Sequence, residues 1–224
     1  MEQTKLIIDG IFDKNSFDHF SQQGIHSFIF DLRPKSFNFI QQYVMIEILK
    51  KEIFGKIHFS LRFENDKDFV IKQFVQEVLK FFPRERLSLS FSDALTSSFY
   101  DQFKLPYSWH FQDFATLEKV AQGEFLTHLI LSIHELVKIS QRGSFETFLQ
   151  KVNKLAMRRD IQIRLLTPWE NSFDDIAIFN LLNQFSYLER VLEVNSEVTS
   201  QYRMLNMQKT TYLLHQMNQK SQIK

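Results

Sequence analysis

Short apolar segments alternate with amphipathic segments along the chain, and one repeat of the pattern takes about 25 residues. The apolar segments predict strands over residues 5–11, 25–32, 56–63, 87–91, 107–111, 126–133, 161–166 and 188–194. The amphipathic segments carry apolar residues every three or four positions and predict helices over residues 15–23, 40–49, 70–81, 94–103, 115–121, 145–156, 173–185 and 207–219. Strands joined by helical crossovers are parallel, so this alternation is typical of a (β/α)8 barrel.

Two of the predicted strands, residues 56–63 and 87–91, alternate between apolar and polar positions. Both faces of a strand in a parallel barrel are buried, so a nearly continuous apolar run is the usual pattern. An open, doubly wound sheet is therefore the structural alternative. No low-complexity linker interrupts the chain, and we expect residues 1–224 to form one α/β domain, a single (β/α)8 barrel.

Composition and charge exclude several classes of partner. The chain has 27 Lys and Arg against 26 Asp and Glu, so no charge excess favours nucleic acid or an anionic membrane surface. No apolar run reaches the roughly 18 residues of a membrane span, and Met1 to Asp9 lacks the apolar core of a signal peptide. We therefore expect a cytoplasmic protein that binds neither nucleic acid nor membrane.

The chain offers little for metal or cofactor chemistry. It has no cysteine, which excludes disulfides, a thiol nucleophile and thiolate metal ligands. The histidines of the predicted strands are not linked by an H-x-H or H-x-x-x-H spacing, and no P-loop or dinucleotide-binding glycine motif occurs. Neither a metal nor a cofactor is expected. Gly is also scarce, at 5 residues, although phosphate-binding barrels use glycines to bring backbone N–H groups close to the ligand.

Catalytic residues of (β/α)8 barrels lie at the carboxyl ends of the strands. The polar residues at the predicted strand ends are Asp9, Asp31, Arg33, Arg62, Asp93, His110, Ser132, His134, Thr167 and Asn195. Barrel mouths are polar also where they are only exposed to solvent, so position alone does not assign a role to any of these residues. A small-molecule ligand at this mouth is the expected partner.

The first forty residues resemble the amino terminus of phosphoribosylanthranilate isomerase, a (β/α)8 barrel of tryptophan biosynthesis. That family begins with a K-I-C-G-I strand, continues with a helix that ends in glycine, and then runs from a strand into P-K-S-x-R. Gly10-Ile11, Gly24 and Pro34-Lys35-Ser36 have the same mutual spacing here without a gap. The resemblance implies the barrel fold and, as an expectation, a site at the carboxyl ends of the strands.

The same resemblance implies that the catalytic pair is changed. The isomerase uses a cysteine base after its first strand and an aspartate acid after its sixth. Asp9 stands at the position of the cysteine, and Ser132 stands at the position of the aspartate. A carboxylate can act as a base, but a serine hydroxyl does not donate a proton readily near neutral pH. We therefore expect Asp9 and Ser132 to share the mouth, with the acid lost.

The residues implied to bind substrate are changed as well. Arg33 is a candidate at the end of the second strand, but the family's next arginine, which contacts the anthranilate part, is replaced by Asn38. After the fourth strand the family's Q-L-H-G reads Leu89-Ser90-Phe91-Ser92, so Phe91 replaces a polar residue.

The phosphate site of the family lies after the seventh and eighth strands. There A-G-G-L reads Leu166-Thr167-Pro168-Trp169, and S-S-G-V-E reads Asn195-Ser196-Glu197-Val198-Thr199. Pro168 has no N–H to donate, and Glu197 places a negative charge where a phosphate would bind. Thr167, Asn195, Ser196 and Glu197 are thus the candidate residues of an altered corner.

Two interpretations follow. In the first, the chain is a barrel of this isomerase type that no longer catalyses the ring-opening isomerisation and is retained as a binding or interaction protein. In the second, it is an active isomerase of this or a related sugar phosphate, with Asp9 as the base and Asp31 or Asp93 as the acid. The simultaneous loss of the acid, the arginine and both glycine sites favours the first.

Overall fold

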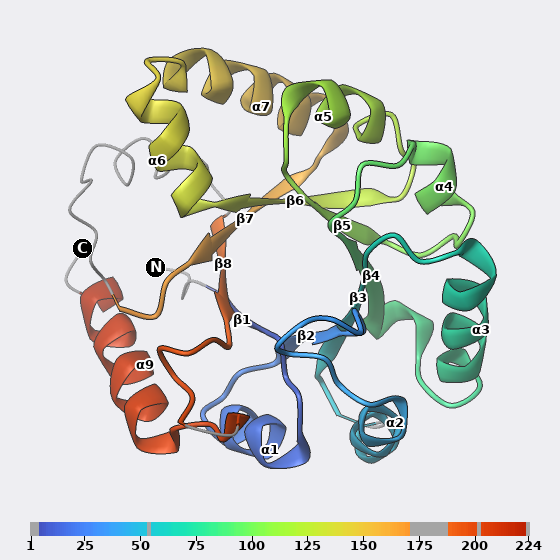
Figure 1. Cartoon of the computed structure of the whole chain (residues 1–224), viewed down its shortest axis with the longest axis vertical. Coiled ribbons are helices and arrows are strands. Elements are labelled where there is room, and N and C mark those ends of the chain that lie inside the picture. Colours follow the sequence, from blue (N-terminus) through green and yellow to red (C-terminus); the bar gives the residue numbers. More distant parts are fainter. Residues whose placement is uncertain (1–4, 53–54, 171–187, 201–202, 223–224) are drawn as a thin grey trace.

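Eight parallel strands close into a barrel in the computed structural model, which describes residues 5–52, 55–170, 188–200 and 203–222 (Figure 1). Each strand pairs with its neighbour in the sequence, and β1 pairs with β8 to close the sheet. The strands are β1 (Leu6–Asp9), β2 (Ser27–Asp31), β3 (His58–Phe63), β4 (Leu87–Phe91), β5 (Tyr107–His110), β6 (Leu126–Ser132), β7 (Gln162–Thr167) and β8 (Leu188–Glu193). The predicted barrel is confirmed, and the open sheet is wrong.

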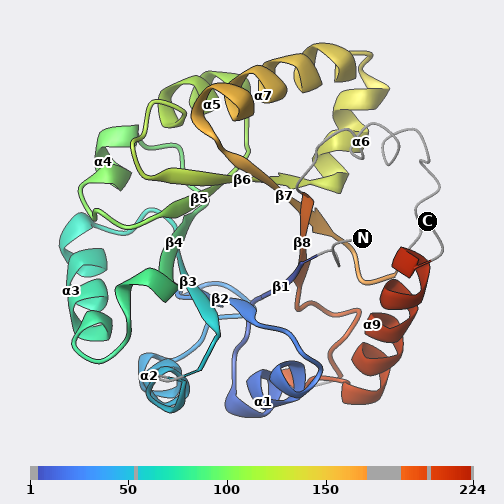
Figure 2. The ribbon, with the colours of Figure 1, turned by 180° about the vertical axis from the view of Figure 1, so that it is seen from behind.

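The helices form a ring outside the barrel, as both views along its axis show (Figures 1 and 2). They are α1 (Lys14–Gln22), α2 (Gln42–Lys51), α3 (Asp68–Leu79), α4 (Ser97–Asp101), α5 (Phe114–Val120), α6 (Ile133–Gln141), α7 (Phe145–Arg159) and α9 (Met207–Gln222), with a short 3-10 helix η1 at Arg84–Arg86. The helix predicted over residues 173–185 lies outside the described residues. No described helix is long and apolar enough to cross a membrane.

The connection between β6 and β7 corrects the sequence-based prediction. The sixth strand was expected to include Ile133, but it ends at Ser132, and Ile133 is the first residue of α6. The sequence analysis assigned no helix there. The signal was present, because Ile133, Leu136 and Val137 have helical spacing and all three pack on the core.

Helix α4 is shorter than predicted, because side-chain hydrogen bonds hold the preceding residues in a loop. The Tyr100 hydroxyl donates to the main-chain and side-chain oxygens of Asp93, at 3.0 and 2.6 Å. The same hydroxyl accepts the N–H of Leu95 at 3.0 Å. These contacts take up main-chain groups that a longer helix would have used within itself.

Aromatic side chains fill the layer between the barrel and its helices. Phe30 stacks on Phe59 with ring centroids 5.0 Å apart, and Phe91 lies 4.5 Å from Tyr100 by the same measure. Both phenylalanines of the first pair are buried in the main apolar cluster. This layer accounts for the high phenylalanine content of the chain, which is 25 residues.

The interior of the barrel is unusually polar. A small apolar layer of Ile7, Ile29 and Val191 crosses it, with Leu166 packed against it. On the same face of their strands, β3, β4 and β5 present Ser60, Arg62, Ser88, Ser90, Ser108 and His110. Ser60 and Ser88 share a hydrogen bond of 2.5 Å, and Ser90 lies 3.2 Å from Nε2 of His110. The polar alternation of the third and fourth strands thus faces the barrel interior.

Because Phe91 is fully buried in the outer aromatic layer, Phe91→Ala should lower the free energy of unfolding by about 3–5 kcal/mol. Denaturant unfolding monitored by circular dichroism measures this. Phe69→Ala is the matched control, since Phe69 is 60% exposed on α3 and its loss should change stability by less than about 0.5 kcal/mol. Equal effects of the two substitutions would contradict the assignment of Phe91 to the core.

Candidate functional site at the carboxyl ends of the strands

An ion pair between β1 and β3 lies at the centre of the mouth. Oδ2 of Asp9 accepts a hydrogen bond from Nη1 of Arg62 at 2.7 Å, and the same nitrogen lies 3.7 Å from Oε1 of Glu193 on β8. Asp9 is fully buried, and no described residue donates to its Oδ1. The parallel register places these residues together, because Asp9 is aligned with Glu193 across β1 and β8.

The surroundings of Asp9 favour its protonated form. Burial raises the pKa of Asp9, the nearby carboxylates Glu193 and Asp31 act in the same direction and Arg62 opposes them, and the resulting pKa is about 7. A buried carboxyl group with a pKa near neutrality can exchange a proton at physiological pH. The charge of Asp9 can therefore change near physiological pH.

Asp31 and Arg33 neutralise each other at the end of β2. Arg33 donates to Asp31 from Nε at 2.8 Å and from Nη2 at 2.6 Å, and the hydroxyl of Ser36 donates to the same carboxylate at 2.6 Å. Burial by itself would raise the pKa of Asp31, but these hydrogen bonds outweigh it and lower the pKa. Asp31 is thus ionised, which makes it a poor general acid.

The other acid considered from the sequence, Asp93, is bound to the wall of the barrel. It accepts the Tyr100 hydroxyl at 2.6 Å and the backbone N–H of Asn65 at 2.8 Å. Burial raises the pKa of Asp93. Its partners nevertheless hold the carboxyl group against α4 and the loop after β3.

Ser132 ends β6 on the side that faces the barrel interior. Its position is aligned with Leu166, which packs on the apolar layer of the interior. Ser132 also precedes α6 as the N-cap residue, but its side chain makes no capping hydrogen bond. Asp9 and Ser132 thus both lie on the interior face of their strands, and the residue at the position of the family's acid has no carboxyl group.

Asn38 connects the loops after β2 and β8. Its Nδ2 donates to the carbonyl oxygen of Val194 at 2.6 Å, and Asn38 is almost fully buried. A Cβ atom on Gly10 would lie 2.4 Å from that nitrogen, and Gly10 has φ +88. Gly10 is therefore required both by its conformation and by this close approach. The amide nitrogen of Asn38 thus links the loop after β2 to the main chain at the end of β8.

At the corner after β7 and β8, a carboxylate of the chain itself accepts a hydrogen bond from the backbone. Oε2 of Glu197 accepts the backbone N–H of Trp169 at 3.2 Å, and Oδ1 of Asn195 accepts the N–H of Glu197 at 2.9 Å. The buried indole of Trp169 donates to the carbonyl of Glu193 at 2.7 Å. A backbone N–H at this corner is thus already paired with an anionic side chain of the chain itself. Ser196, between these residues, is exposed.

Two of the residues predicted to bind a ligand point away from the mouth. Phe91 faces the helices, where it packs on Tyr100 and Phe103. Thr167 is aligned with Leu192, a member of the outer cluster, and is buried on that side. The reason is the two-residue period of a strand, which turns alternate side chains outward. The position of these residues at the strand ends did not by itself show that their side chains face outward.

His110 completes the described interior at this level. It is buried, and burial lowers its pKa well below the usual value, with Arg62, Arg33 and Arg164 acting in the same direction. Its ring is therefore neutral and cannot serve as a proton donor of ordinary acidity. Within the described residues no group of three His, Asp or Glu side chains is arranged to hold a metal ion.

The sequence analysis missed the connection of Asp9 with Arg62 and Glu193. Arg62 was noted as a strand-end residue, whereas Glu193 was not. No motif links the three, because they come from β1, β3 and β8. Only their side of the strand, set by the alternation of each segment, could have indicated that they face one another.

The comparisons with known proteins bear on the fold. No protein-family model and no curated protein matches the chain. A solved structure of phosphoribosylanthranilate isomerase from Thermotoga maritima is 12% identical, with 98% of this chain and 100% of that chain covered and a TM-score of 0.64. The isomerase from Thermus thermophilus is also 12% identical, with coverage of 95% and 99% and a TM-score of 0.60.

An aldolase of the HpcH/HpaI type from Desulfitobacterium hafniense is similar over 86% of this chain and 87% of its own, at 9% identity and a TM-score of 0.57. Such low identities establish the shared fold and leave the activity open. Barrels of different chemistry resemble this chain, although phosphoribosylanthranilate isomerases recur among the similar structures. This chain has the (β/α)8 fold of these isomerases.

Proposed function

We propose that this chain is a barrel of the phosphoribosylanthranilate isomerase type that no longer catalyses the ring-opening isomerisation and acts as a binding or interaction protein. One observation carries the proposal: the carboxylate at the position of the family's base, Asp9, is buried in an ion pair with Arg62. Oδ2 of this carboxylate is paired with Arg62 and Oδ1 is buried, so neither oxygen is open to a proton of a substrate.

The remaining mouth residues support the same proposal. The reaction also requires an acid, and Ser132 supplies none. Glu197 occupies the Trp169 N–H and adds a negative charge at the corner where the isomerases are expected to bind phosphate. Asn38, in place of an arginine, uses its amide nitrogen to hold the main chain of Val194.

A second candidate function rests on the pKa of Asp9, which burial raises to about 7. That value suits a general base in a proton transfer at neutral pH. An isomerase that used Asp9 in this way would need Arg62 to turn toward Glu193, which lies 3.7 Å from the same nitrogen. Its acid would have to be Asp93, since the pKa of Asp31 is lowered.

Turnover separates the two candidates. Purified protein mixed with phosphoribosylanthranilate should show no loss of anthranilate-type fluorescence above background, because losing a general acid costs about 10²–10⁴-fold in rate. Turnover of order 1 s⁻¹ or faster would contradict the loss of catalysis. Asp113, the exposed N-cap residue of α5, provides the control. If that turnover also disappears in Asp9→Asn but survives in Asp113→Asn, Asp9 is the base of the second candidate.

The titration of Asp9 is a separate prediction. Its carboxyl carbon should titrate near pH 7 in ¹³C NMR, and the signal should vanish in Asp9→Asn but persist in Asp113→Asn. Between pH 4 and 7 the folded protein then holds a proton that the unfolded chain has lost, so the Asp9 contribution to stability falls as the pH rises. A carboxyl that is ionised down to pH 4 would show that Arg62 outweighs burial.

Glu197 should keep phosphate away from the corner after β7 and β8. A carboxylate about 4 Å from a phosphate costs on the order of several kcal/mol at a surface-like dielectric. The backbone amide resonance of Trp169 should therefore not shift with millimolar phosphate in the unmodified protein. It should shift in Glu197→Gly, with Glu197→Gln intermediate because the amide still accepts the Trp169 N–H. A saturable shift in the unmodified protein would refute this role of Glu197.

A further inference from the structure

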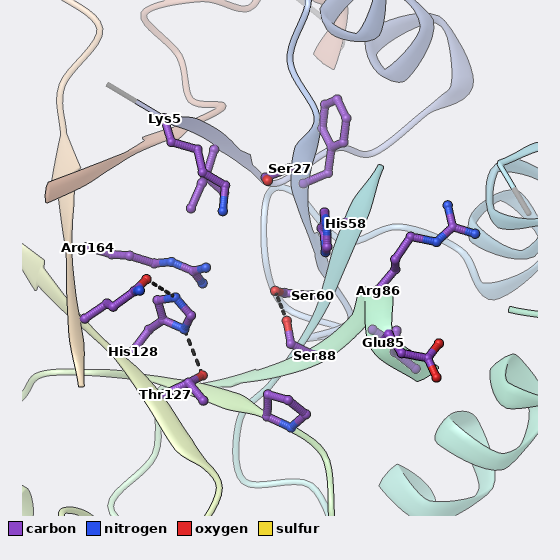
Figure 3. A pocket seen from close by; sticks show the side chains of 15 residues that line it. Lys5, Ser27, His58, Ser60, Glu85, Arg86, Ser88, Thr127, His128 and Arg164 are labelled. Atoms are coloured by element: carbon purple, nitrogen blue, oxygen red, sulfur yellow. Dashed lines mark hydrogen bonds between the residues drawn. The ribbon is translucent and has the colours of Figure 1, made fainter. Parts of the chain in front are cut away.

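A cavity of about 280 Å³ lies at the opposite end of the barrel, where the strands begin. Residues from the first halves of the strands line it, including Ser27 of β2, His58 of β3 and His128 of β6. Figure 3 shows the side chains of Lys5, Arg164 and His128 on one side of an open centre and those of His58 and Ser60 on the other. The cavity is separate from the candidate site at the carboxyl ends, since the apolar layer of Ile7, Ile29, Leu166 and Val191 lies between them.

Arg164 is the buried cation of this cavity. Its side chain is 9% exposed, and its Nε donates to Oε2 of Glu189 at 2.7 Å. Its guanidinium group points into the open centre (Figure 3). Among the described residues, none accepts a hydrogen bond from the two terminal nitrogens of Arg164. A guanidinium group has five N–H donors, so most of its donor capacity faces the cavity unused.

The charges around the cavity leave an excess of one positive charge. Nζ of Lys5 lies 2.7 Å from Oε1 of Glu189, so Lys5 and Arg164 share this carboxylate. The other charged lining residues, Arg86 and Glu85 of η1, point away from the centre in Figure 3. Arg86 donates to the carbonyl oxygen of Glu52 at 3.0 Å. Lys5, Arg164 and the carboxylate of Glu189 that they share therefore sum to two cations and one anion.

Both histidines of the cavity have lowered pKa values, mainly because they are buried. For His128, Arg164 and Lys5 act in the same direction as burial while Glu189 and the hydrogen bond with Gln162 oppose them, and the resulting pKa is about 3. The pKa of His58 is lowered by burial and then by Lys5, Arg86 and Arg164, against Glu189. The two rings are neutral at pH 7, and they report an environment that disfavours additional positive charge.

Hydroxyl groups complete the lining. Ser60 and Ser88 are joined by a hydrogen bond of 2.5 Å, and the hydroxyl of Thr127 lies 2.8 Å from Nδ1 of His128. Branched apolar side chains dominate the interior layers of most (β/α)8 barrels, and burying an arginine costs free energy that packing does not return. An anion that paired with the terminal nitrogens of Arg164 would offset that cost.

We propose that the amino end of the barrel is a binding site for a small oxyanion, a carboxylate or a phosphate monoester, held by the terminal nitrogens of Arg164 together with Lys5. The planar fork of a guanidinium group matches both kinds of oxyanion with two parallel hydrogen bonds. The hydroxyl groups of Ser60 and Ser88 then face the remainder of the ligand. The volume corresponds to roughly nine water molecules in the liquid, so the ligand has few non-hydrogen atoms. This site goes beyond the proposed function and does not depend on it.

The test is an NMR titration of the histidine rings of the full chain with inorganic phosphate and, separately, with lactate. Sodium chloride at equal ionic strength is the reference, because salt alone screens charges. A bound oxyanion should shift the His58 and His128 resonances saturably and raise the pKa of His58 by about one unit. Saturation by lactate alone assigns a carboxylate, and saturation by phosphate alone assigns a phosphate ester.

Three variants of the site and one control variant complete the test. Arg164→Gln should weaken binding at least tenfold, and Arg164→Lys, which keeps the charge but loses the fork, should lie between it and the unmodified protein. Lys5→Gln should also weaken binding, and it secures the test if Arg164 variants do not fold, since the Lys5 side chain is 53% exposed. Arg158→Gln, at a cation outside the cavity, should leave the affinity unchanged.

Shifts that match those in sodium chloride, or binding that both Arg164→Gln and Lys5→Gln retain, would refute the site. These resonances report the amino end alone, whereas the turnover assay and the Trp169 amide report the carboxyl end. Failure of one proposal therefore leaves the other measurable.

Discussion

The structure depends on how the inward-facing side chains of eight strands are accommodated in the barrel interior. Closing a parallel sheet into a barrel buries both faces of every strand, and one face points at the other strands across a narrow interior. In this chain that face carries arginine, carboxylate, histidine and serine side chains, apart from the layer formed by Ile7, Ile29, Leu166 and Val191. The fold accommodates many of these polar groups because they pair inside the barrel, as Arg62 does with Asp9 and Ser60 with Ser88.

Two ion pairs, one on either side of the apolar layer, provide most of the pairing for these buried polar groups. Arg62 and Asp9 pair toward the carboxyl ends, and Arg164 and Glu189 pair toward the amino ends, each at 2.7 Å. The two differ in what is left over. At the carboxyl ends the excess is negative, because Glu193 also faces Arg62, and this adds to the rise in the pKa of Asp9 that burial causes. At the amino ends the excess is positive, because Lys5 and Arg164 share one carboxylate.

The loops at the carboxyl ends show how a barrel mouth can be stabilised by its own side chains. Asn38 and Arg203 both reach across the mouth region to main-chain carbonyl groups, those of Val194 and Phe39. Glu197 accepts the Trp169 N–H, a contact of the kind that an anionic ligand makes in a phosphate-binding loop. These contacts within the chain connect the ends of β2, β7 and β8. They use hydrogen-bond donors in a region where a catalytic barrel leaves donors for its substrate.

The sequence by itself determined the order, type and approximate bounds of most elements, and with them the closed barrel. Periodicity is a local property, and the crossover helices make neighbouring strands parallel. Gly10 and Gly24 could also be placed from the sequence alone, and both have positive φ in the structure. By contrast, the shortening of α4 depended on contacts such as that of Tyr100 with Asp93.

Only the tertiary structure decided which polar residues meet. Asp9, Arg62 and Glu193 are far apart in sequence, and it is strand register that brings their side chains together. The parity of Phe91 and Thr167 likewise followed from register, which turned both away from the mouth. The polar alternation of β3 and β4 was visible in the sequence as evidence against a barrel. Its meaning changed once closure placed Ser60 and Ser88 in a shared interior, because a buried hydroxyl is stable when another side chain can accept its hydrogen bond.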